Sequence, residues 1–196
     1  MKEDVLEQIV DDYLQFKGYL TTHNVRFRPG TSDVGYSARH DSVHSDVDVL
    51  GYNPTLRGHE KVVVVSCKAW QTGFAADRML AQLRGTAPNP KRERWKNLRE
   101  LWVPKWSAAF RAEIERRTGC SRFTYYLAVT RVVGDVSAWE RDPTIRENLG
   151  GNPFRFLTLE EMWSSVLRTV TLTPASSEMG RLAQLLKAAG LTPPAG

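Results

Sequence analysis

The stretch that decides the fold is residues 61–68, KVVVVSCK, which follows residues 45–52, SDVDVLGY, after an eight-residue connection. Four consecutive valines are typical of a strand that is covered on both faces. Acids and valines alternate in the earlier segment, so we expect Asp46 and Asp48 on one face of a second strand and Val47 and Val49 on the other. The connection predicts a hairpin, which brings Asp48 beside Lys68 at the same end of the pair.

Helical patterns surround this hairpin. Apolar residues at helical spacing predict a helix over 3–17 that ends at Gly18, and a second helix is expected over 75–86. Another helix is predicted to begin at Pro104 and to end before Gly119, with one buried row formed by Trp106, Phe110 and Ile114.

The remaining elements are three strands and two helices. Strands are expected over 19–29, 122–133 and 154–157. The last strand leads into a helix that reaches about Val170, because Thr158 and Glu161 have capping-box spacing. Thr173 and Pro174 predict the start of a final helix that ends at Gly190.

The order of these elements predicts an α/β protein with a mixed central β-sheet flanked by helices. We expect residues 1–170 to form one domain with a basic helical insertion at about 88–119, and residues 171–196 to form a C-terminal helix and tail that pack on it or dimerise. The composition, with 25% charged and 41% hydrophobic residues, is that of a soluble globular protein.

Several classes of protein are disfavoured. No apolar run approaches the roughly 20 residues needed to span a bilayer, and the acidic N-terminus is unlike a signal peptide. Cys67 and Cys120 are too few for a disulfide framework and are expected to be reduced. We therefore predict a cytoplasmic protein with no membrane partner and no organic cofactor.

The formal net charge of +5 is concentrated in residues 91–117, which hold nine Lys/Arg against four Asp/Glu. Such a concentration favours a polyanionic partner, although a solvated helical face is an equal alternative. The residues predicted to contact DNA phosphates are Lys91, Arg92, Arg94, Lys96 and Arg99.

SDVDVLGYNP and KVVVVSCKAW together resemble the core of the PD-(D/E)XK, or restriction-endonuclease-like, nuclease superfamily, in which an Asp on one strand precedes an acid-X-Lys on the next. Glu7, followed by Gly18-Tyr19, resembles the first-helix Glu and GY of Mrr-like restriction enzymes and Holliday-junction resolvases. The similarity covers about residues 5–71, and more weakly 123–130. It implies an αβββαβ core.

The resemblance implies a Mg²⁺ (or Mn²⁺) site that hydrolyses phosphodiester bonds of double-stranded or branched DNA. The implied metal ligands are Asp48, Glu7 and the backbone carbonyl of Cys67, with Asp46 as a substitute and Glu3 as the alternative to Glu7. Lys68 would orient or deprotonate the attacking water, or stabilise the developing charge. Trp70 and Gln71 match the KxWQ pattern of the relatives, which implies that Gln71 lies near the scissile phosphate, and Trp70 is otherwise a packing residue.

Ser66 departs from the family pattern, which has an acid at this position. Ser66 could bind a metal-bound water while Asp48 and Glu7 hold the metal, or Asp46 could take over the missing role. Alternatively the site is inactive and the domain binds nucleic acid or a protein, or Ser66 is an engineered replacement.

We therefore predict a metal-dependent DNA endonuclease that serves defence, repair or mobile-element processing. A homodimer would suit this activity, because two sites would cut both strands. The alternatives are a catalytically inactive nuclease-fold module, and an unrelated α/β protein in which Asp48 and Lys68 are only a surface ion pair. His40 and His44 lie in a Gly/Ser-rich segment over 30–44, which we interpret as a loop that could be a lid or a DNA-contacting arm, more readily than as a zinc site.

Overall fold

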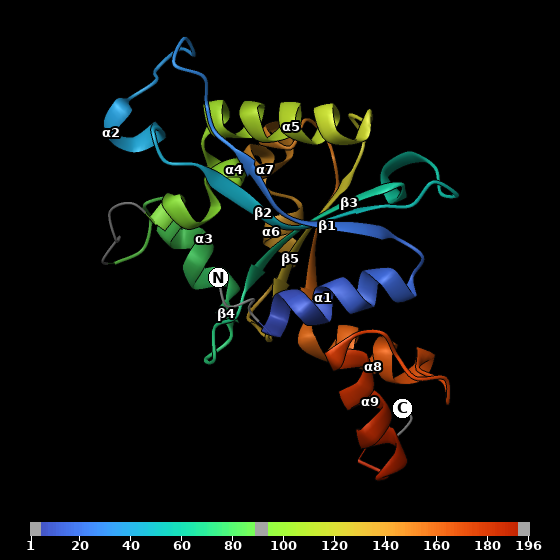
Figure 1. The fold of residues 1–196 in the computed structure, drawn as a ribbon. Coiled ribbons are helices and arrows are strands. Elements are labelled where there is room, and N and C mark those ends of the chain that lie inside the picture. Colours follow the sequence, from blue (N-terminus) through green and yellow to red (C-terminus); the bar gives the residue numbers. More distant parts are fainter. Residues whose placement is uncertain (1–4, 89–93, 192–196) are drawn as a thin grey trace.

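The structure, a computed structural model, describes residues 5–88 and 94–191. Its centre is a five-stranded mixed β-sheet in the order β1-β2-β3-β5-β7 (Figure 1). The first three strands are antiparallel, while β3, β5 and β7 run parallel. The strands are β1 (Leu20–Phe27), β2 (Ser45–Tyr52), β3 (Val62–Lys68), β5 (Thr124–Val129) and β7 (Phe154–Thr158). The predicted α/β class, mixed sheet and hairpin are confirmed.

Helices cover both faces of this sheet (Figure 1). On one face, α1 (Val5–Phe16) and α8 (Leu159–Thr169) pack over the side chains of Val63, Val65 and Cys67. On the other face, α5 (Pro104–Thr118) packs over Val62 and Val64, together with α4 (Arg99–Trp102) and α7 (Pro143–Asn148). The valine run is therefore buried on both sides, as its composition requires.

Local sequence signals set several helix boundaries as expected. Pro104 begins α5, and Gly119 ends it in the left-handed conformation with φ 68°. Trp106, Phe110 and Ile114 are buried, as predicted for one row of this helix. Both hydrogen bonds of the capping box at Thr158 are present at the start of α8.

A second, two-stranded parallel sheet lies beyond the C-terminal ends of β3 and β5, and the sequence did not indicate it. It pairs β4 (Phe74–Ala75) with β6 (Val132–Val133) and is followed by α3 (Ala76–Leu83) and α6 (Ser137–Glu140). Trp139 is fully buried here between Phe74, Phe154 and Phe156. The predicted strand over 122–133 is thus two strands, one in each sheet.

Two predicted helices differ from the observed ones. In the described residues before α5, the helical insertion predicted at about 88–119 contains only a 3₁₀ turn, η2 (Arg94–Leu98), followed by the single turn of α4. The final helix, α9 (Glu178–Ala188), begins after the N-cap Ser177, four residues beyond Pro174. Ser177 supplies the hydroxyl that a helix start requires, and its Oγ also donates to Asp12 Oδ2 at 2.6 Å.

The connection between β1 and β2 carries a short helix, α2 (Ala38–Asp41), which projects from the molecule in Figure 1. Asp41 is fully buried and fixes this arm to α5, because it accepts hydrogen bonds from Lys105 Nζ at 2.6 Å and Trp106 Nε1 at 2.9 Å. His40 is part of α2 and His44 is exposed beyond it. Within the described ranges, no helix has the length and apolar character that crossing a membrane would take.

Candidate active site

Strands β2 and β3 separate at the point where the predicted site residues lie. Their ladder runs from Tyr52–Val62 to Val49–Val65 and goes no further. Beyond it, Asp48 Oδ2 accepts a hydrogen bond from the backbone N–H of Cys67 at 2.5 Å. The Asp48 carboxylate therefore occupies the gap between the two strands and replaces a backbone acceptor of the ladder.

The alternation of side chains along β2 breaks at Asp48. Val47 packs in the core under α5, whereas Val49 packs under α1 on the opposite face, so the expectation that the two valines share a face is wrong. Opposite this point, β1 has Asn24 in the left-handed conformation with φ 52°. These two irregularities turn the end of β2 and leave Asp48 between the faces of the sheet.

Ser66 and Lys68 lie together on the α5 side of β3. Lys68 Nζ donates to Ser66 Oγ at 3.1 Å, and Lys68 remains partly exposed while Ser66 is buried. Since the N–H and C=O of a strand residue point to the same side, the Cys67 carbonyl faces the same gap as its N–H. Asp48, Ser66, the Cys67 carbonyl and Lys68 are thus grouped as the sequence predicts.

A second carboxylate, Glu100 on α4, belongs to this group. Glu100 is 5% exposed, and its Oε1 accepts a hydrogen bond from the Tyr125 hydroxyl of β5 at 2.6 Å. Burial raises the pKa of Glu100, the Tyr125 hydroxyl and the Lys68 ammonium lower it, and the charge of Asp48 raises it further. Tyr125 pairs with Val64 of β3, so its hydroxyl holds Glu100 on the same side of the sheet as Ser66 and Lys68.

The pKa of Asp48 is also raised, mainly because burial disfavours its charged form. Lys68 and the Cys67 N–H oppose this effect, and the exposed carboxylate of Asp46 adds to it. Two carboxylates with raised pKa values beside one ammonium form an arrangement that a bound cation would relieve.

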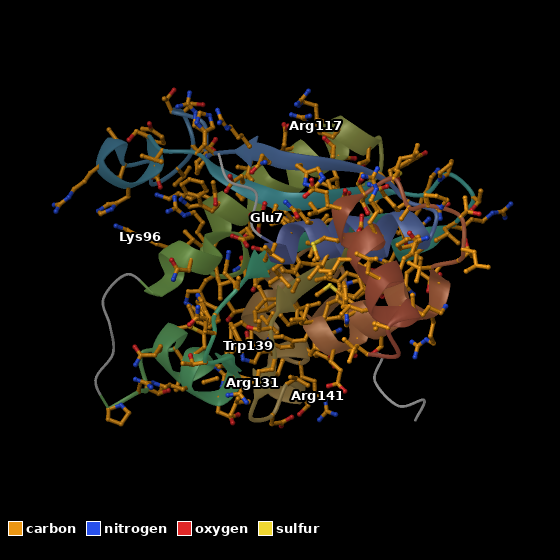
Figure 2. The ribbon with its side chains drawn as sticks, turned by 60° about the horizontal axis from the view of Figure 1, so that its bottom comes forward. Glu7, Lys96, Arg117, Arg131, Trp139 and Arg141 are labelled. Atoms are coloured by element: carbon orange, nitrogen blue, oxygen red, sulfur yellow. The ribbon has the colours of Figure 1, made fainter. Side chains whose placement is uncertain are left out.

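Glu7 lies on a helix that covers the other face of the sheet. It lies in the first turn of α1, whose neighbours on the sheet include Cys67, while Ser66 and Lys68 point to the opposite face. In both views the N-terminal end of α1, which carries Glu7, lies beside the C-terminal end of β3 (Figures 1 and 2). Glu3, the alternative to Glu7, is outside the described residues.

Gln71 and Trp70 follow Lys68 in the turn that leads to β4. Gln71 is exposed. Trp70 stacks on Phe74 with an interplanar angle of 4°, and its carbonyl accepts the Thr130 hydroxyl. Trp70 therefore packs at the junction of the two sheets, and Gln71 projects from the edge where β3 ends.

The predicted DNA-binding residues divide into three groups. Lys91 and Arg92 lie outside the described residues, and for Arg94 only the backbone in η2 is described. Lys96 projects from the segment before α4 (Figure 2). Arg99 turns inward, with its guanidinium 4.3 Å from the Trp106 ring and its Nε donating to the Lys96 carbonyl, and burial lowers its pKa.

The donors suit a hard cation only in part. Over residues 5–88 and 94–191, no three His, Cys, Asp or Glu side chains gather into a group able to hold a metal ion. Asp48 and Glu100 supply two carboxylates, and the Cys67 carbonyl and Ser66 hydroxyl supply neutral oxygens. Mg²⁺ uses oxygen ligands of this kind and keeps several waters of its own, so this donor set suits Mg²⁺ better than Zn²⁺.

Sequence reasoning missed Glu100 and Tyr125. Glu100 falls between Leu98 and Leu101, both fully buried, so an acid interrupts an apolar stretch in the basic segment. This interruption was the signal available, because a carboxylate is rarely buried without a specific partner. Comparison with known proteins adds no further assignment: no family model, curated protein or solved structure matches the chain.

Proposed function

We propose that the protein is a metal-dependent DNA endonuclease built on a restriction-endonuclease-like core. The observation that supports this proposal is the grouping of Asp48, Lys68 and Glu100 where β2 and β3 separate. The proposal is also supported by the order of α1, the antiparallel strands β1 to β3, the helices α3 to α5 and the parallel strand β5, which resembles the αβββαβ pattern apart from the additional α2 and β4.

In this proposal Glu100 takes the place of the acid that is missing at position 66. Ser66 and Lys68 extend from β3 to the same face on which α4 packs, and Tyr125 of β5 orients the Glu100 carboxylate. Asp48, Glu100 and the Cys67 carbonyl would hold the metal. The cation would neutralise charge on the scissile phosphate and lower the pKa of a water.

The protein groups have separate tasks in hydrolysis. The Cys67 N–H fixes Asp48 in one orientation, so that its other carboxylate oxygen is preorganised. Lys68, which lies beside Asp48 and Ser66, stabilises the negative charge that develops on the phosphate. Ser66 holds the Lys68 ammonium through its hydroxyl.

Basic residues on the same end of the sheet would hold the DNA backbone. Because β2 is antiparallel to β3, the β1–β2 connection lies at the end where Lys68 is found. The end of β1 carries exposed Arg26, and the connection itself carries exposed Arg28 and Arg39. Together with Lys96, these side chains would bind phosphates without reading bases.

The test is nicking of supercoiled plasmid and branched DNA in Mg²⁺ or Mn²⁺. Asp48→Asn, Lys68→Ala and Glu100→Gln should each lower the rate by at least about 100-fold, while salt-sensitive DNA affinity is retained. Glu113→Gln, which removes a carboxylate from the outer side of α5, is the matched control and should cleave normally. Wild-type protein that binds DNA but never cleaves it would contradict the enzymatic proposal.

The swap Ser66→Glu/Glu100→Gln tests the relocation of the acid directly. If Glu100 of α4 has taken over the role of the acid that the family pattern places at position 66, a glutamate at position 66 should compensate for its loss. The double variant should then regain part of the cleavage that Glu100→Gln loses. Cleavage by Glu100→Gln at the wild-type rate would show that Glu100 has no part in the reaction.

A second candidate is a nucleic-acid-binding module without catalysis. The serine at position 66 and the lack of a three-ligand cluster in the described part of the chain favour it. It predicts DNA affinity that falls with salt and no cleavage in either metal, which the same assay distinguishes.

A further inference from the structure

The end of the sheet farthest from Lys68 has a hollow of about 550 Å³ beside α5. We call it the distal hollow; its functional lining is His59, Arg111, Glu115, Ser121, Arg122 and Asn152. It lies where β5 and β7 begin, whereas Lys68 lies where β3 ends. A strand of seven residues separates the two ends by roughly 20 Å, so the distal hollow is distinct from the proposed active site.

The floor of the distal hollow is rigid because Asn152 joins three loops. Its Oδ1 accepts the Phe123 N–H at 3.0 Å and lies 3.0 Å from His59 Nδ1. Its Nδ2 donates to the carbonyls of Ser121, at 3.1 Å, and Leu149, at 2.9 Å. All the hydrogen-bonding groups of this buried side chain are used, as in a preorganised binding site.

Arg111 lines the hollow with an unsatisfied donor. Its Nε is buried and has no hydrogen-bond partner among the described residues. Its Nη1 packs against Gly150, where an added Cβ would come within 2.4 Å and where φ is 63°. The guanidinium of Arg111 therefore keeps hydrogen-bonding capacity that its surroundings do not use, and its fork of N–H donors suits phosphate oxygens.

A second hollow of about 400 Å³ adjoins the first across Ser121 and Arg122, which line both. Arg57 and Lys61 also line this second hollow, and its lining contains no acid. Arg122 therefore stands between two basic spaces, which matches two neighbouring phosphate groups. Glu115 in the first hollow suits a hydroxyl donor, such as that of a sugar.

We propose that the two hollows form a nucleotide site that binds adjacent phosphates through Arg111, Arg122, Arg57 and Lys61. The sugar hydroxyl donates to Glu115. The combined volume is within the range of small-molecule sites. The nucleotide is either free or the phosphorylated end of a nucleic acid, and the test below separates these two sources. The site does not depend on the proposed nuclease activity.

Calorimetric titration at low salt with pyrophosphate, adenosine diphosphate and a 5′-phosphorylated trinucleotide tests the proposal. The wild type should bind pyrophosphate and adenosine diphosphate, and Arg111→Gln and Arg122→Gln should each weaken binding by at least about tenfold. Arg168→Gln, which removes an exposed arginine of α8, is the matched control. A trinucleotide that binds more tightly than adenosine diphosphate would identify a nucleic-acid end as the ligand.

Glu115→Gln supplies a readout that a general loss of charge would not give. It should strengthen pyrophosphate binding, because a like charge is removed, and weaken binding of adenosine diphosphate. Asp48→Asn should bind all three probes as the wild type does. Absence of binding by the wild type up to about 1 mM ligand, or equal affinity in both arginine variants and the control, would overturn the proposal. Arg122 is exposed, so its variant remains informative if Arg111→Gln fails to fold.

Discussion

Replacing Glu100 by glutamine should make the protein more stable near neutral pH while it removes the proposed activity. Burial raises the pKa of Glu100 above the unfolded value of 4.5, so the folded protein retains a proton that the unfolded chain releases. The free energy of unfolding of the wild type therefore falls as pH rises from about 4.5 to the folded-state pKa. The slope of this fall is about 1.4 kcal/mol per pH unit.

Glutamine has no such proton linkage, and its Oε1 can still accept the Tyr125 hydroxyl. Urea unfolding between pH 4 and pH 8 should show equal stability of Glu100→Gln and wild type at the acidic end. The variant should gain an advantage as pH rises, until the advantage becomes constant above the folded-state pKa. A gain in stability coupled to a loss of function marks a group retained for its chemistry.

Glu113→Gln is the control with the opposite sign. Arg116 and Arg117 lower the pKa of Glu113 to about 2, so its contribution to stability is present above 4.5 and is lost as pH falls toward 2. This variant should be less stable than the wild type at neutral pH and equal to it in strong acid. If Glu100→Gln behaves in the same way, Glu100 is a structural ion-pair partner and the reasoning above is refuted.

Three further changes test the packing around the site by denaturant unfolding. Asp41→Ala should lower the free energy of unfolding by about 3 kcal/mol, because it removes the ion-pair partner of Lys105 and leaves the buried indole N–H of Trp106 without its acceptor; an exposed arm that contributed nothing to the core would show no change. Trp139→Ala should cost about 4 kcal/mol, since the ring is fully buried among three phenylalanines, and a loss below about 1 kcal/mol would mean that the second sheet does not belong to the folding unit. Thr158→Ala should cost about 1 kcal/mol through loss of the α8 cap, which a Thr158→Ser control should largely retain.

The sheet and its principal helices were predictable because their sequence signals are local. A run of four valines, a polar connection and an alternating partner define the hairpin, while Pro104, Gly119 and the Thr158 capping box mark helix ends. The two-residue strands β4 and β6 have no such signal. They form because the segments that follow β3 and β5 stay close together beyond the C-terminal ends of these strands. That closeness is a consequence of tertiary structure.

The residues of the proposed site that lie on the β2–β3 hairpin were predictable. Asp48, Ser66 and Lys68 meet because an antiparallel hairpin fixes their register. The orientation of Asp48 was not predictable, since regular alternation would place it on a face of the sheet, and only the break opposite Asn24 directs it toward the Cys67 N–H. The position of Glu100 beside these residues depends on how α4 packs against the sheet. Because α4 has only four residues, the sequence pattern is too short to predict that packing.

The way in which α4 is held explains how a single helical turn can fix the carboxylate of Glu100 in the proposed site. One isolated turn is unstable, because helix nucleation fixes several residues for one hydrogen bond. Here the carbonyl of Glu100 accepts the Ser107 hydroxyl at 2.7 Å, and that of Leu101 accepts Asn148 Nδ2 at 2.9 Å. The neighbouring helices α5 and α7 thus satisfy the carbonyls that a short helix leaves free. In the described part of the basic segment, the fixed, inward-facing member of this turn is Glu100, and Arg99 stabilises the turn by stacking on Trp106.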